Sequence, residues 1–173
     1  MFRSKGRTSR STTGTEQVHR PFSGLAVQTP AIRRGVCTGQ TRKHDLMHTV
    51  LFACVHNAGR SQMAAAFFNR LANPQIARAI SAGTQPGAAV HPEVLAAMQE
   101  VGIDLSGAQP TLLTDELARG AQLLVTMGCG ETCPVVPGLL REDCNLEDPK
   151  GKSAQQVRAI RDEIRRHVEN LIQ

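Results

Sequence analysis

A continuous apolar segment followed at once by an amphipathic helix pattern constrains the fold most. Residues 50–53 read Val-Leu-Phe-Ala, and an uninterrupted apolar run is typical of a strand that is buried on both faces. Apolar residues then recur at three- and four-residue spacing from Met63 to Leu71, and Asn73-Pro74 ends this pattern. Such spacing predicts a helix with one buried face. The sequence therefore predicts a β-strand joined to a crossover helix.

The alternation of strands and helices continues along the rest of the chain. Further strands are predicted over residues 77–82 and 122–127, and helices are predicted to start at Pro92, to cover residues 114–119, and to follow Ser153, which opens a capping-box pattern. Strands that alternate with helices predict a single three-layer α/β domain, in which helices cover both faces of a parallel sheet.

Residues 1–46 differ in composition from residues 47–173. They carry nine Lys and Arg against two acids, whereas residues 47–173 carry eleven against thirteen. The first segment has no sustained apolar period, so we expect a disordered extension. A nucleic-acid-binding arm, an organelle transit peptide and an over-long gene model all fit it. The last is favoured because Met47 stands directly before the first predicted strand. The mildly acidic remainder argues against nucleic-acid binding.

The apolar residues also bear on the compartment. No run approaches the roughly 18 consecutive apolar residues of a membrane span, and no apolar core of a signal peptide is present near the N-terminus. The chain has five cysteines. An odd, unevenly spaced set without a secretion signal favours reduced, working thiols over a disulfide scaffold. We therefore expect a cytoplasmic protein that does not contact membranes.

One loop carries the residues best suited to chemistry. Residues 54–61 read Cys-Val-His-Asn-Ala-Gly-Arg-Ser and lie between the first predicted strand and its helix. Ligands of parallel sheets bind beyond the carboxyl ends of strands. The backbone N–H groups of such a turn can converge on an anion, and the helix dipole adds positive potential. We predict that an oxyanion is bound by Val55, His56, Asn57, Ala58, Gly59, Arg60 and Ser61.

Individual residues of this loop have distinct predicted roles. Cys54 is the predicted nucleophile, because the positive field of the loop favours its thiolate form, and Ser61 could donate a hydrogen bond to that thiolate. The planar guanidinium of Arg60 can hold two oxygens at once. Asn57 and Gly59 are the residues that best tolerate left-handed backbone angles. The alternative, a buried structural cysteine beside a chance arginine, does not explain the strand, helix, Asn and Gly around the pair.

The loop resembles the anion loop of the low molecular weight protein tyrosine phosphatases and of the arsenate reductases that share their fold. The resemblance runs from Met47 to the C-terminus and includes Gln62-Met63-Ala64, Ser81-Ala82-Gly83-Thr84, Asp148-Pro149 and Arg161-Asp162-Glu163-Ile164. The Val-His-Asn-Ala-Gly-Arg-Ser wording, with Thr-Met-Gly-Cys-Gly over residues 126–130, is most similar to arsenate reductases, and to their actinobacterial members in particular. The resemblance implies a sheet of four parallel strands.

The resemblance also implies that Asp148 is a general acid. It would protonate the oxygen that leaves arsenic or phosphorus as the thiolate attacks, and Pro149 would stiffen its loop. Without the resemblance, Asp148 is one acid in the run Glu142, Asp143, Glu147 and Asp148, and such a run is more often a solvated turn.

Cys129 and Cys133 follow the strand predicted over residues 122–127. They can be incidental thiols, half of a zinc site that lacks two further ligands, or a redox pair. In related thioredoxin-coupled reductases, which space the two cysteines more widely, such a pair resolves the Cys–arsenic adduct. Related actinobacterial reductases use a small thiol, mycothiol, and need only the first cysteine. We expect no metal and no tightly bound cofactor, only an external reductant: thioredoxin, or mycothiol with mycoredoxin.

Three functions are compatible with these residues. Arsenate reduction, with phosphate as a competitor, uses both Cys54 and the Cys129/Cys133 pair. Phosphatase activity on tyrosine needs the loop and Asp148, but such enzymes use aromatic walls for the substrate ring, and this chain has no Tyr and no Trp. A non-catalytic oxyanion-binding module would keep the loop and would not need the second pair of cysteines. Arsenate reduction is therefore the leading interpretation.

A chain that starts at Met47 is expected to fold and to bind oxyanions like the full-length chain, because residues 1–46 have too few apolar residues to contribute to a core. Thermal unfolding and phosphate binding measured on both proteins would check this. A fall in melting temperature of more than a few degrees in the shortened protein would show that the first segment stabilises the domain.

Overall fold

The computed structural model describes residues 47–129, 133 and 135–173. The expectations for residues 1–46 lie outside the described residues. The elements are, in chain order, β1 (His48–Cys54), α1 (Arg60–Leu71), β2 (Ala77–Gly83), α2 (Pro92–Gln99), α3 (Asp115–Arg119), β3 (Leu123–Thr126), β4 (Leu140–Asp143) and α4 (Ala154–Ile172).

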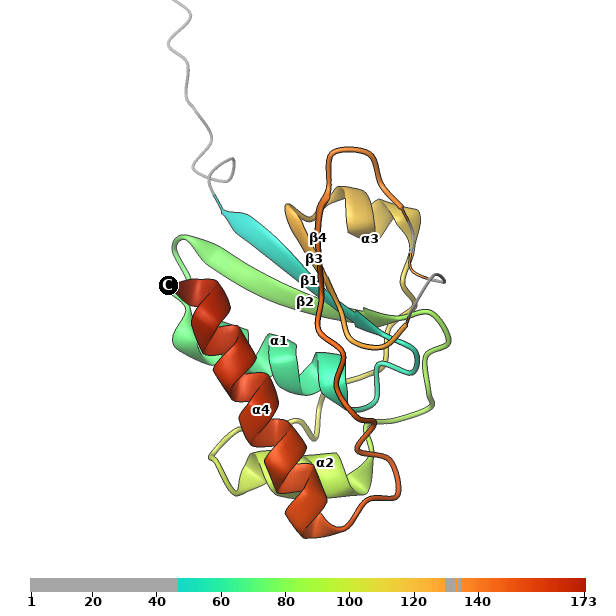
Figure 1. The fold of residues 1–173 in the computed structure, drawn as a ribbon, viewed down its shortest axis with the longest axis vertical. Coiled ribbons are helices and arrows are strands. Elements are labelled where there is room, and N and C mark those ends of the chain that lie inside the picture. Colours follow the sequence, from blue (N-terminus) through green and yellow to red (C-terminus); the bar gives the residue numbers. More distant parts are fainter. Residues whose placement is uncertain (1–46, 130–132, 134) are drawn as a thin grey trace, which may run out of the picture. The chain divides into compact units, whose positions relative to one another are not determined.

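The strands form one parallel sheet in the order β2-β1-β3-β4 (Figure 1). β1 therefore has a neighbour on each side: its last residue, Cys54, pairs with Gly83 of β2, and Ala53 pairs with Thr126 of β3. Every residue of β1 after His48 is buried. The prediction of a parallel α/β sheet with flanking helices, and the resemblance to the low molecular weight phosphatase fold, are confirmed.

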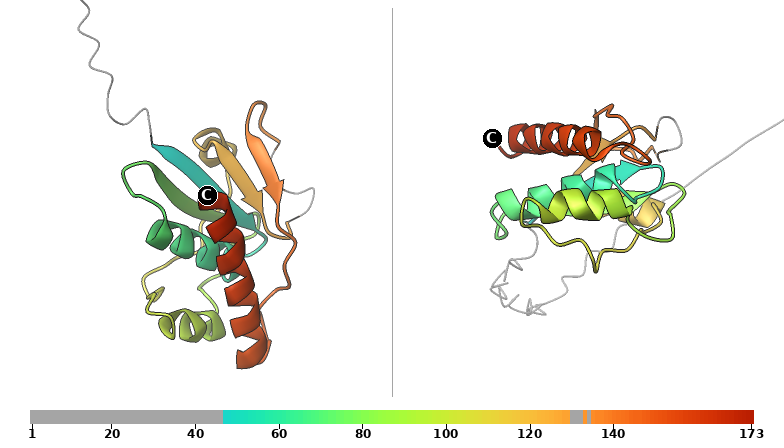
Figure 2. Two further views of the ribbon diagram at one scale, coloured as in Figure 1. Left: turned by 60° about the vertical axis from the view of Figure 1, so that its left-hand side comes forward. Right: turned by 90° about the horizontal axis from the view of Figure 1, so that it is seen from below.

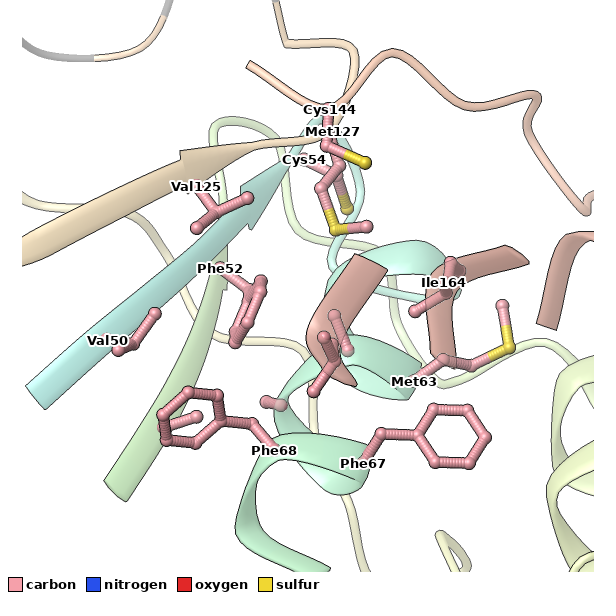
Figure 3. Close-up of a cluster of buried hydrophobic side chains, with 14 of the residues drawn as sticks. Val50, Phe52, Cys54, Met63, Phe67, Phe68, Val125, Met127, Cys144 and Ile164 are labelled. Atoms are coloured by element: carbon pink, nitrogen blue, oxygen red, sulfur yellow. The ribbon is translucent and has the colours of Figure 1, made fainter. Parts of the chain in front are cut away.

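Helices α1, α2 and α4 cover one face of the sheet (Figures 1 and 2). Alternate residues of β1, Val50, Phe52 and Cys54, point into this layer. The rings of Phe52 and Phe68 lie 6.0 Å apart between centroids at 60° to each other, a tilted contact that aromatic pairs favour. Figure 3 shows these side chains in the main hydrophobic cluster, with Ile164 of α4 reaching in from above α1. This cluster anchors the end of β1 that leads into the loop.

The second face of the sheet is covered more thinly. Leu51 and Ala53 of β1 point into a smaller cluster that α3 and the stretches on either side of β3 complete. Figure 1 shows α3 on the side of the strands opposite α1, α2 and α4. Cys129 and Cys133 belong to this second cluster. The two cysteines therefore pack on the opposite face of the sheet from the main core.

The helix boundaries follow the sequence signals closely. Ser153 caps α4 and forms both halves of the capping box with Gln156, as predicted, and Thr114 accepts a hydrogen bond from the third residue of α3. α4 is amphipathic, with Val157, Ile160, Ile164 and Val168 among its buried residues. In the described part of the chain, no helix is long and apolar enough to cross a membrane.

The fourth strand, β4, was not located from the sequence, although the resemblance implied it. Its residues read Leu-Arg-Glu-Asp, and most of them are exposed. The run of acids interpreted as a possible solvated turn therefore contributes Glu142 and Asp143 to an edge strand. An edge strand has one free side and needs no apolar run, and charged side chains on it oppose pairing with other chains.

Replacing Ile164 by Ala should lower the free energy of unfolding by roughly 2–5 kcal/mol, because Ile164 is fully buried between α4 and the main cluster. Arg166→Ala, on the exposed side of the same helix, should change it by less than about 0.5 kcal/mol. Urea denaturation of both variants would measure the difference. Equal effects of the two substitutions would contradict the packing described for α4.

Candidate active site

Cys54 is the last residue of β1, and residues 55–59 lead directly into α1. Its neighbour across the sheet is Gly83 of β2. On the other side, Met127 donates its N–H to the carbonyl of Ala53 at 2.7 Å. Cys54 therefore lies in the middle of the carboxyl edge of the sheet, at the point where the N-terminus of α1 opens. This is the place that parallel sheets offer to ligands.

The backbone of the loop is fixed by the segment that follows β2. N–H groups of that segment donate to four loop carbonyls: Thr84 to Cys54 (3.1 Å), Gln85 to Val55 (2.8 Å), Gly87 to His56 (2.8 Å) and His91 to Ala58 (2.9 Å). The His56 ring also lies 3.2 Å from the carbonyl oxygen of Gln85, measured from Nδ1. These bonds hold the predicted oxyanion-binding residues in one conformation.

Asn57 is the centre of the loop. It is fully buried and has a left-handed φ of 48°, as predicted. Its side-chain amide donates to the hydroxyl of Ser61 at 2.8 Å. Its carbonyl oxygen accepts hydrogen bonds from the N–H of Thr111 at 2.8 Å and from the side chain of Gln62 at 3.2 Å. One side chain thus ties the loop to α1 and to the stretch before α3.

Two glycines make room for the loop. A Cβ on Gly83 would lie 2.7 Å from the carbonyl oxygen of Val55 and 2.8 Å from the nitrogen of Asn57. A Cβ on Gly59 would lie 2.7 Å from Pro149. The φ of Gly59 is −149°, so the prediction of a left-handed angle there is wrong. Glycine is needed at this position because the loop of Pro149 packs directly on it.

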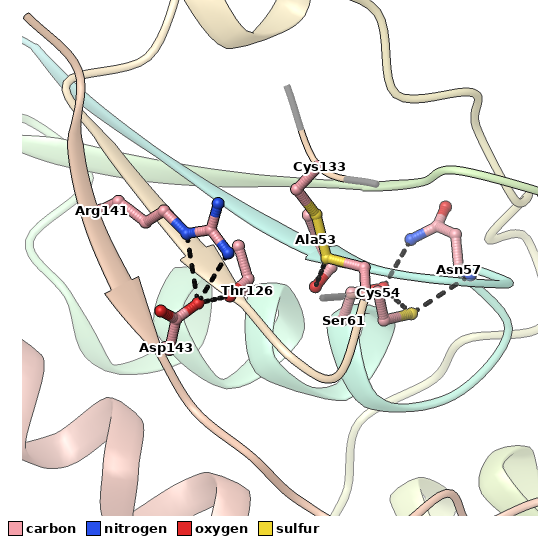
Figure 4. Close-up of a disulfide and its surroundings, with 9 residues drawn as sticks. Ala53, Cys54, Asn57, Ser61, Thr126, Cys133, Arg141 and Asp143 are labelled. Carbon is pink, nitrogen blue, oxygen red and sulfur yellow. Dashed lines mark hydrogen bonds and ion pairs between the residues drawn. A yellow bond between two sulfur atoms is a disulfide. The ribbon is translucent and has the colours of Figure 1, made fainter. Parts of the chain in front are cut away.

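The thiol of Cys54 is surrounded by hydrogen-bonding groups. Its Sγ lies 3.0 Å from the hydroxyl of Ser61 and accepts a hydrogen bond from the N–H of Asn57 at 3.2 Å (Figure 4). The residue is 2% exposed. Both groups are able to donate a hydrogen bond to the sulfur. The predicted contact between Cys54 and Ser61 is confirmed.

Arg60, the first residue of α1, brings the loop together with residues near the C-terminal helix. Its two terminal nitrogens donate to the carbonyl of Leu146 at 2.9 Å and to Oδ2 of Asp148 at 3.0 Å. The side chain is 8% exposed. A Cβ on Gly128, where φ is 82°, would lie 2.5 Å from the guanidinium, so a larger residue there would displace the Arg60 side chain from its present position. The guanidinium is held close to the loop that it serves.

The structure thus places Asp148 beside the loop, as the resemblance implied. Its Oδ1 accepts a hydrogen bond from the N–H of Lys150 at 3.0 Å while Oδ2 contacts Arg60. The carboxyl group is 43% exposed, so solvent and substrate can reach it. Pro149 packs on Gly59. The predicted nucleophile, arginine and acid therefore meet, although about 90 residues separate the acid from the other two.

Cys129 and Cys133 form a disulfide with their Cα atoms 6.1 Å apart. Both are buried, and Sγ of Cys129 lies 3.8 Å from the carbonyl oxygen of Ala53, the residue before Cys54 (Figure 4). Residues 130–132 and 134 lie outside the described residues. Among the described residues, no group of three or more His, Cys, Asp or Glu could hold a metal ion.

Cys144 is a second thiol near the site. It is the first residue after β4, it is buried, and Figure 3 shows it with Met127 and Cys54 at the carboxyl edge of the sheet. Burial, reinforced by the negative charges of Glu142 and Glu163, raises the pKa of Cys144 to about 11. Since the thiolate is the reactive form, this cysteine is protected from reaction at neutral pH.

Sequence reasoning missed several supporting groups. Gly128 makes room for Arg60, the carbonyl of Leu146 accepts from it, and the N–H of Thr111 holds Asn57. Only Gly128 had a usable signal, since a glycine just after a buried strand and near a candidate loop often marks a close backbone approach. Backbone groups such as the other two leave no trace in the sequence.

Comparison with known proteins gives a consistent result. Residues 49–173 match the family described as low molecular weight phosphotyrosine protein phosphatase. A curated relative from Synechocystis sp., named glutaredoxin arsenate reductase, is 38% identical over 129 residues, which cover 73% of this chain and 97% of that protein.

Solved structures agree with the sequence relatives. The Corynebacterium glutamicum thioredoxin-dependent arsenate reductase is 38% identical with a TM-score of 0.62, and the match covers 72% of this chain and 60% of that one. A structure described as an arsenate reductase in the phosphate binding state is 34% identical with a TM-score of 0.64, over 73% of this chain and 97% of the other.

Cys144 should resist alkylation in the folded protein. With its pKa raised to about 11, only a very small fraction is thiolate at pH 8, and the thiolate fraction rises only as the pH approaches 11. Iodoacetamide treatment at pH 8, followed by peptide mass mapping, should leave Cys144 unmodified in the native protein and label it fully in urea. Rapid labelling of Cys144 in the native protein at pH 8 would contradict its described burial.

Proposed function

The chain belongs to the low molecular weight phosphotyrosine protein phosphatase family, and from this premise we propose that it is an arsenate reductase. The observation that carries the proposal is the placement of Cys54 between two hydrogen-bond donors, next to Arg60 and Asp148, with the Cys129–Cys133 pair behind it. Relatives named arsenate reductase, at 34–38% identity, support it.

In the first step, the Cys54 thiolate attacks arsenate. A sulfur–arsenic bond forms, one arsenic–oxygen bond breaks, and Asp148 gives the proton with which that oxygen leaves as water. Arg60 and the loop N–H groups hold the charge of the remaining oxygens. A guanidinium has five N–H donors, and the contacts with Leu146 and Asp148 engage two of its nitrogens.

In the second step, a thiol supplies the electrons. Cys129 attacks the sulfur of Cys54, a Cys54–Cys129 disulfide forms, and the electron pair of the sulfur–arsenic bond leaves with arsenic(III) as arsenite. Cys133 then attacks Cys129 and frees Cys54. The Cys129–Cys133 disulfide beside a free Cys54 corresponds to the end of this sequence. Sγ of Cys129 lies 3.8 Å from the carbonyl oxygen of Ala53, the residue before Cys54, but on the face of the sheet opposite the Cys54 side chain, so the proposed attack requires Cys129 to move.

An external reductant must then reopen the Cys129–Cys133 disulfide. Relatives are named for glutaredoxin and for thioredoxin. We favour a thioredoxin-type protein because it acts on a disulfide that the chain itself forms. In the alternative route, a small thiol such as mycothiol attacks the Cys54–arsenic adduct directly, mycoredoxin completes the reduction, and Cys129 and Cys133 are not required.

Tyrosine phosphatase activity is the second candidate, because the family is described by that activity. It would use Cys54, Arg60 and Asp148 in the same roles, with water in place of the second thiol. The absence of Tyr and Trp from the chain favours a small inorganic oxyanion, since no Tyr or Trp is available to stack on an aryl ring. An oxyanion-binding module without catalysis would need neither Asp148 beside Arg60 nor the cysteine pair.

A cytoplasmic location stays a prediction.

The redox proposal predicts a fixed stoichiometry. Prereduced protein given arsenate without any reductant should release one arsenite per chain and end with a Cys129–Cys133 disulfide. Cys54→Ser and Cys129→Ser should release none, and Cys133→Ser should trap a Cys54–Cys129 bond that mass spectrometry detects. Cys144→Ala, a matched control that removes a buried thiol outside the proposed path, should behave like the wild type.

Two outcomes would redirect the proposal. Full activity of Cys129→Ser and Cys133→Ser with mycothiol and mycoredoxin would establish the small-thiol route. Hydrolysis of aryl phosphates, without arsenite release under any reductant, would favour the phosphatase.

A further inference from the structure

We propose that Glu93, in the first turn of α2, is a positioning residue that holds the loop of Asp148 in place during catalysis. The inference rests on the proposed function, in which Asp148 is the general acid. Glu93 contacts neither the oxyanion loop nor the proposed reacting atoms in the described hydrogen bonds; its partner is the backbone of Gly151, three residues after Asp148.

The contact itself is well defined. Oε1 of Glu93 accepts a hydrogen bond from the N–H of Gly151 at 2.9 Å. Gly151 has a left-handed φ of 68°, and the N–H of Lys152 donates to the carbonyl of Pro149 at 3.2 Å. Residues 149–152 thus form a tight turn directly after Asp148, and Glu93 binds the outer end of this turn.

The turn is held at three points. Asp148 contacts Arg60 at 3.0 Å, Pro149 packs on Gly59, and Gly151 is bound by Glu93. The contact with Arg60 is the one that catalysis must weaken, because Arg60 is also the side chain that grips the oxyanion. Once substrate competes for the guanidinium, three contacts still hold this segment: the packing of Pro149 on Gly59, the hydrogen bond from Lys150 to Asp148, and the hydrogen bond from Gly151 to Glu93.

Glu93 is suited to this task because it stays ionised. The pKa of Glu93 is lowered, first by the N–H of Gly151 and then by its own backbone N–H, with a smaller contribution from His91, while burial and the negative charge of Asp148 act in the opposite direction. Its place in the first turn of α2 adds the favourable helix dipole. An ionised carboxylate only accepts hydrogen bonds, which suits it to the N–H of Gly151.

Two substitutions separate the hydrogen bond from other effects of the side chain. Glu93→Ala removes the acceptor and should lower kcat for arsenate about tenfold, a part of the 10²–10⁴-fold that a general acid supplies. KM for arsenate and the Kd of inorganic phosphate should stay within about twofold, because the oxyanion loop is untouched. Glu93→Gln keeps an oxygen acceptor and should recover most of kcat. Glu116→Ala, an exposed acid in the first turn of α3, is the matched control and should match the wild type.

A double variant tests whether Glu93 acts through Asp148. In Asp148→Asn protein no acid is left to position, so adding Glu93→Ala should slow turnover no further. A purely structural role would slow both backgrounds equally. Unchanged kcat of Glu93→Ala, equal losses in the two backgrounds, or failure of Glu93→Gln to recover kcat would each overturn the proposal.

One readout does not depend on activity. Hydrogen exchange of the Gly151 amide should be faster in Glu93→Ala than in the wild type and close to the wild type in Glu93→Gln. If the wild-type protein releases no arsenite with any reductant, the proposed function fails, and the Gly151 exchange still decides whether Glu93 holds this turn. Unchanged exchange in Glu93→Ala would refute the tether in every case.

Discussion

The hydrogen bonds of the buried Asn57 side chain are the constraint on which the rest of the site depends. They join the loop to Ser61 of α1 and to the N–H of Thr111, and Gln62 of α1 also reaches the stretch of Thr111 through the carbonyl of Gln109. A buried amide in a left-handed conformation is expensive unless all its polar atoms are satisfied. Here they are, and the same residue aims its own N–H at the sulfur of Cys54. The hydrogen bonds of this one asparagine therefore help to fix the position of the thiol.

Three glycines make this arrangement possible because they have no side chain. Gly83, Gly59 and Gly128 each stand where a methyl group would collide with the loop, with Pro149 or with Arg60. The three glycines belong to different parts of the chain. Each removes a steric conflict at one place, and the cysteine, the arginine and the acid can therefore pack closely. Cys54 and Arg60 are almost fully buried in this arrangement, whereas the carboxyl group of Asp148 is 43% exposed.

The sequence predicted the parts of the molecule that have strong local signals. The buried strand, the amphipathic helices, the caps and the Cys54–Ser61 loop all follow from apolar period and turn chemistry. β4 was not located because an edge strand needs no apolar run. The reason given for glycine at position 59 was wrong because the constraint comes from Pro149, about 90 residues away. Glu93 could not be found either, since its partner is a backbone N–H. Asp148 was assigned to the site only through the family resemblance, because local sequence patterns carry no information on contacts between distant residues.

The burial of the cysteine pair has a consequence for the proposed reduction of its disulfide by an external thiol. Both sulfur atoms are packed within the thin second cluster, with exposures of 6% and 2% for Cys129 and Cys133. In the proposed reaction a thiol from outside must approach in line with the sulfur–sulfur bond, and sulfur atoms this deeply buried offer it little accessible surface. Under the proposed function, such an attack requires the side chains around the pair to move apart locally. In the proposed reaction, reduction therefore depends on the thinner face of the sheet, while the main core on the other face holds Cys54 at the end of β1.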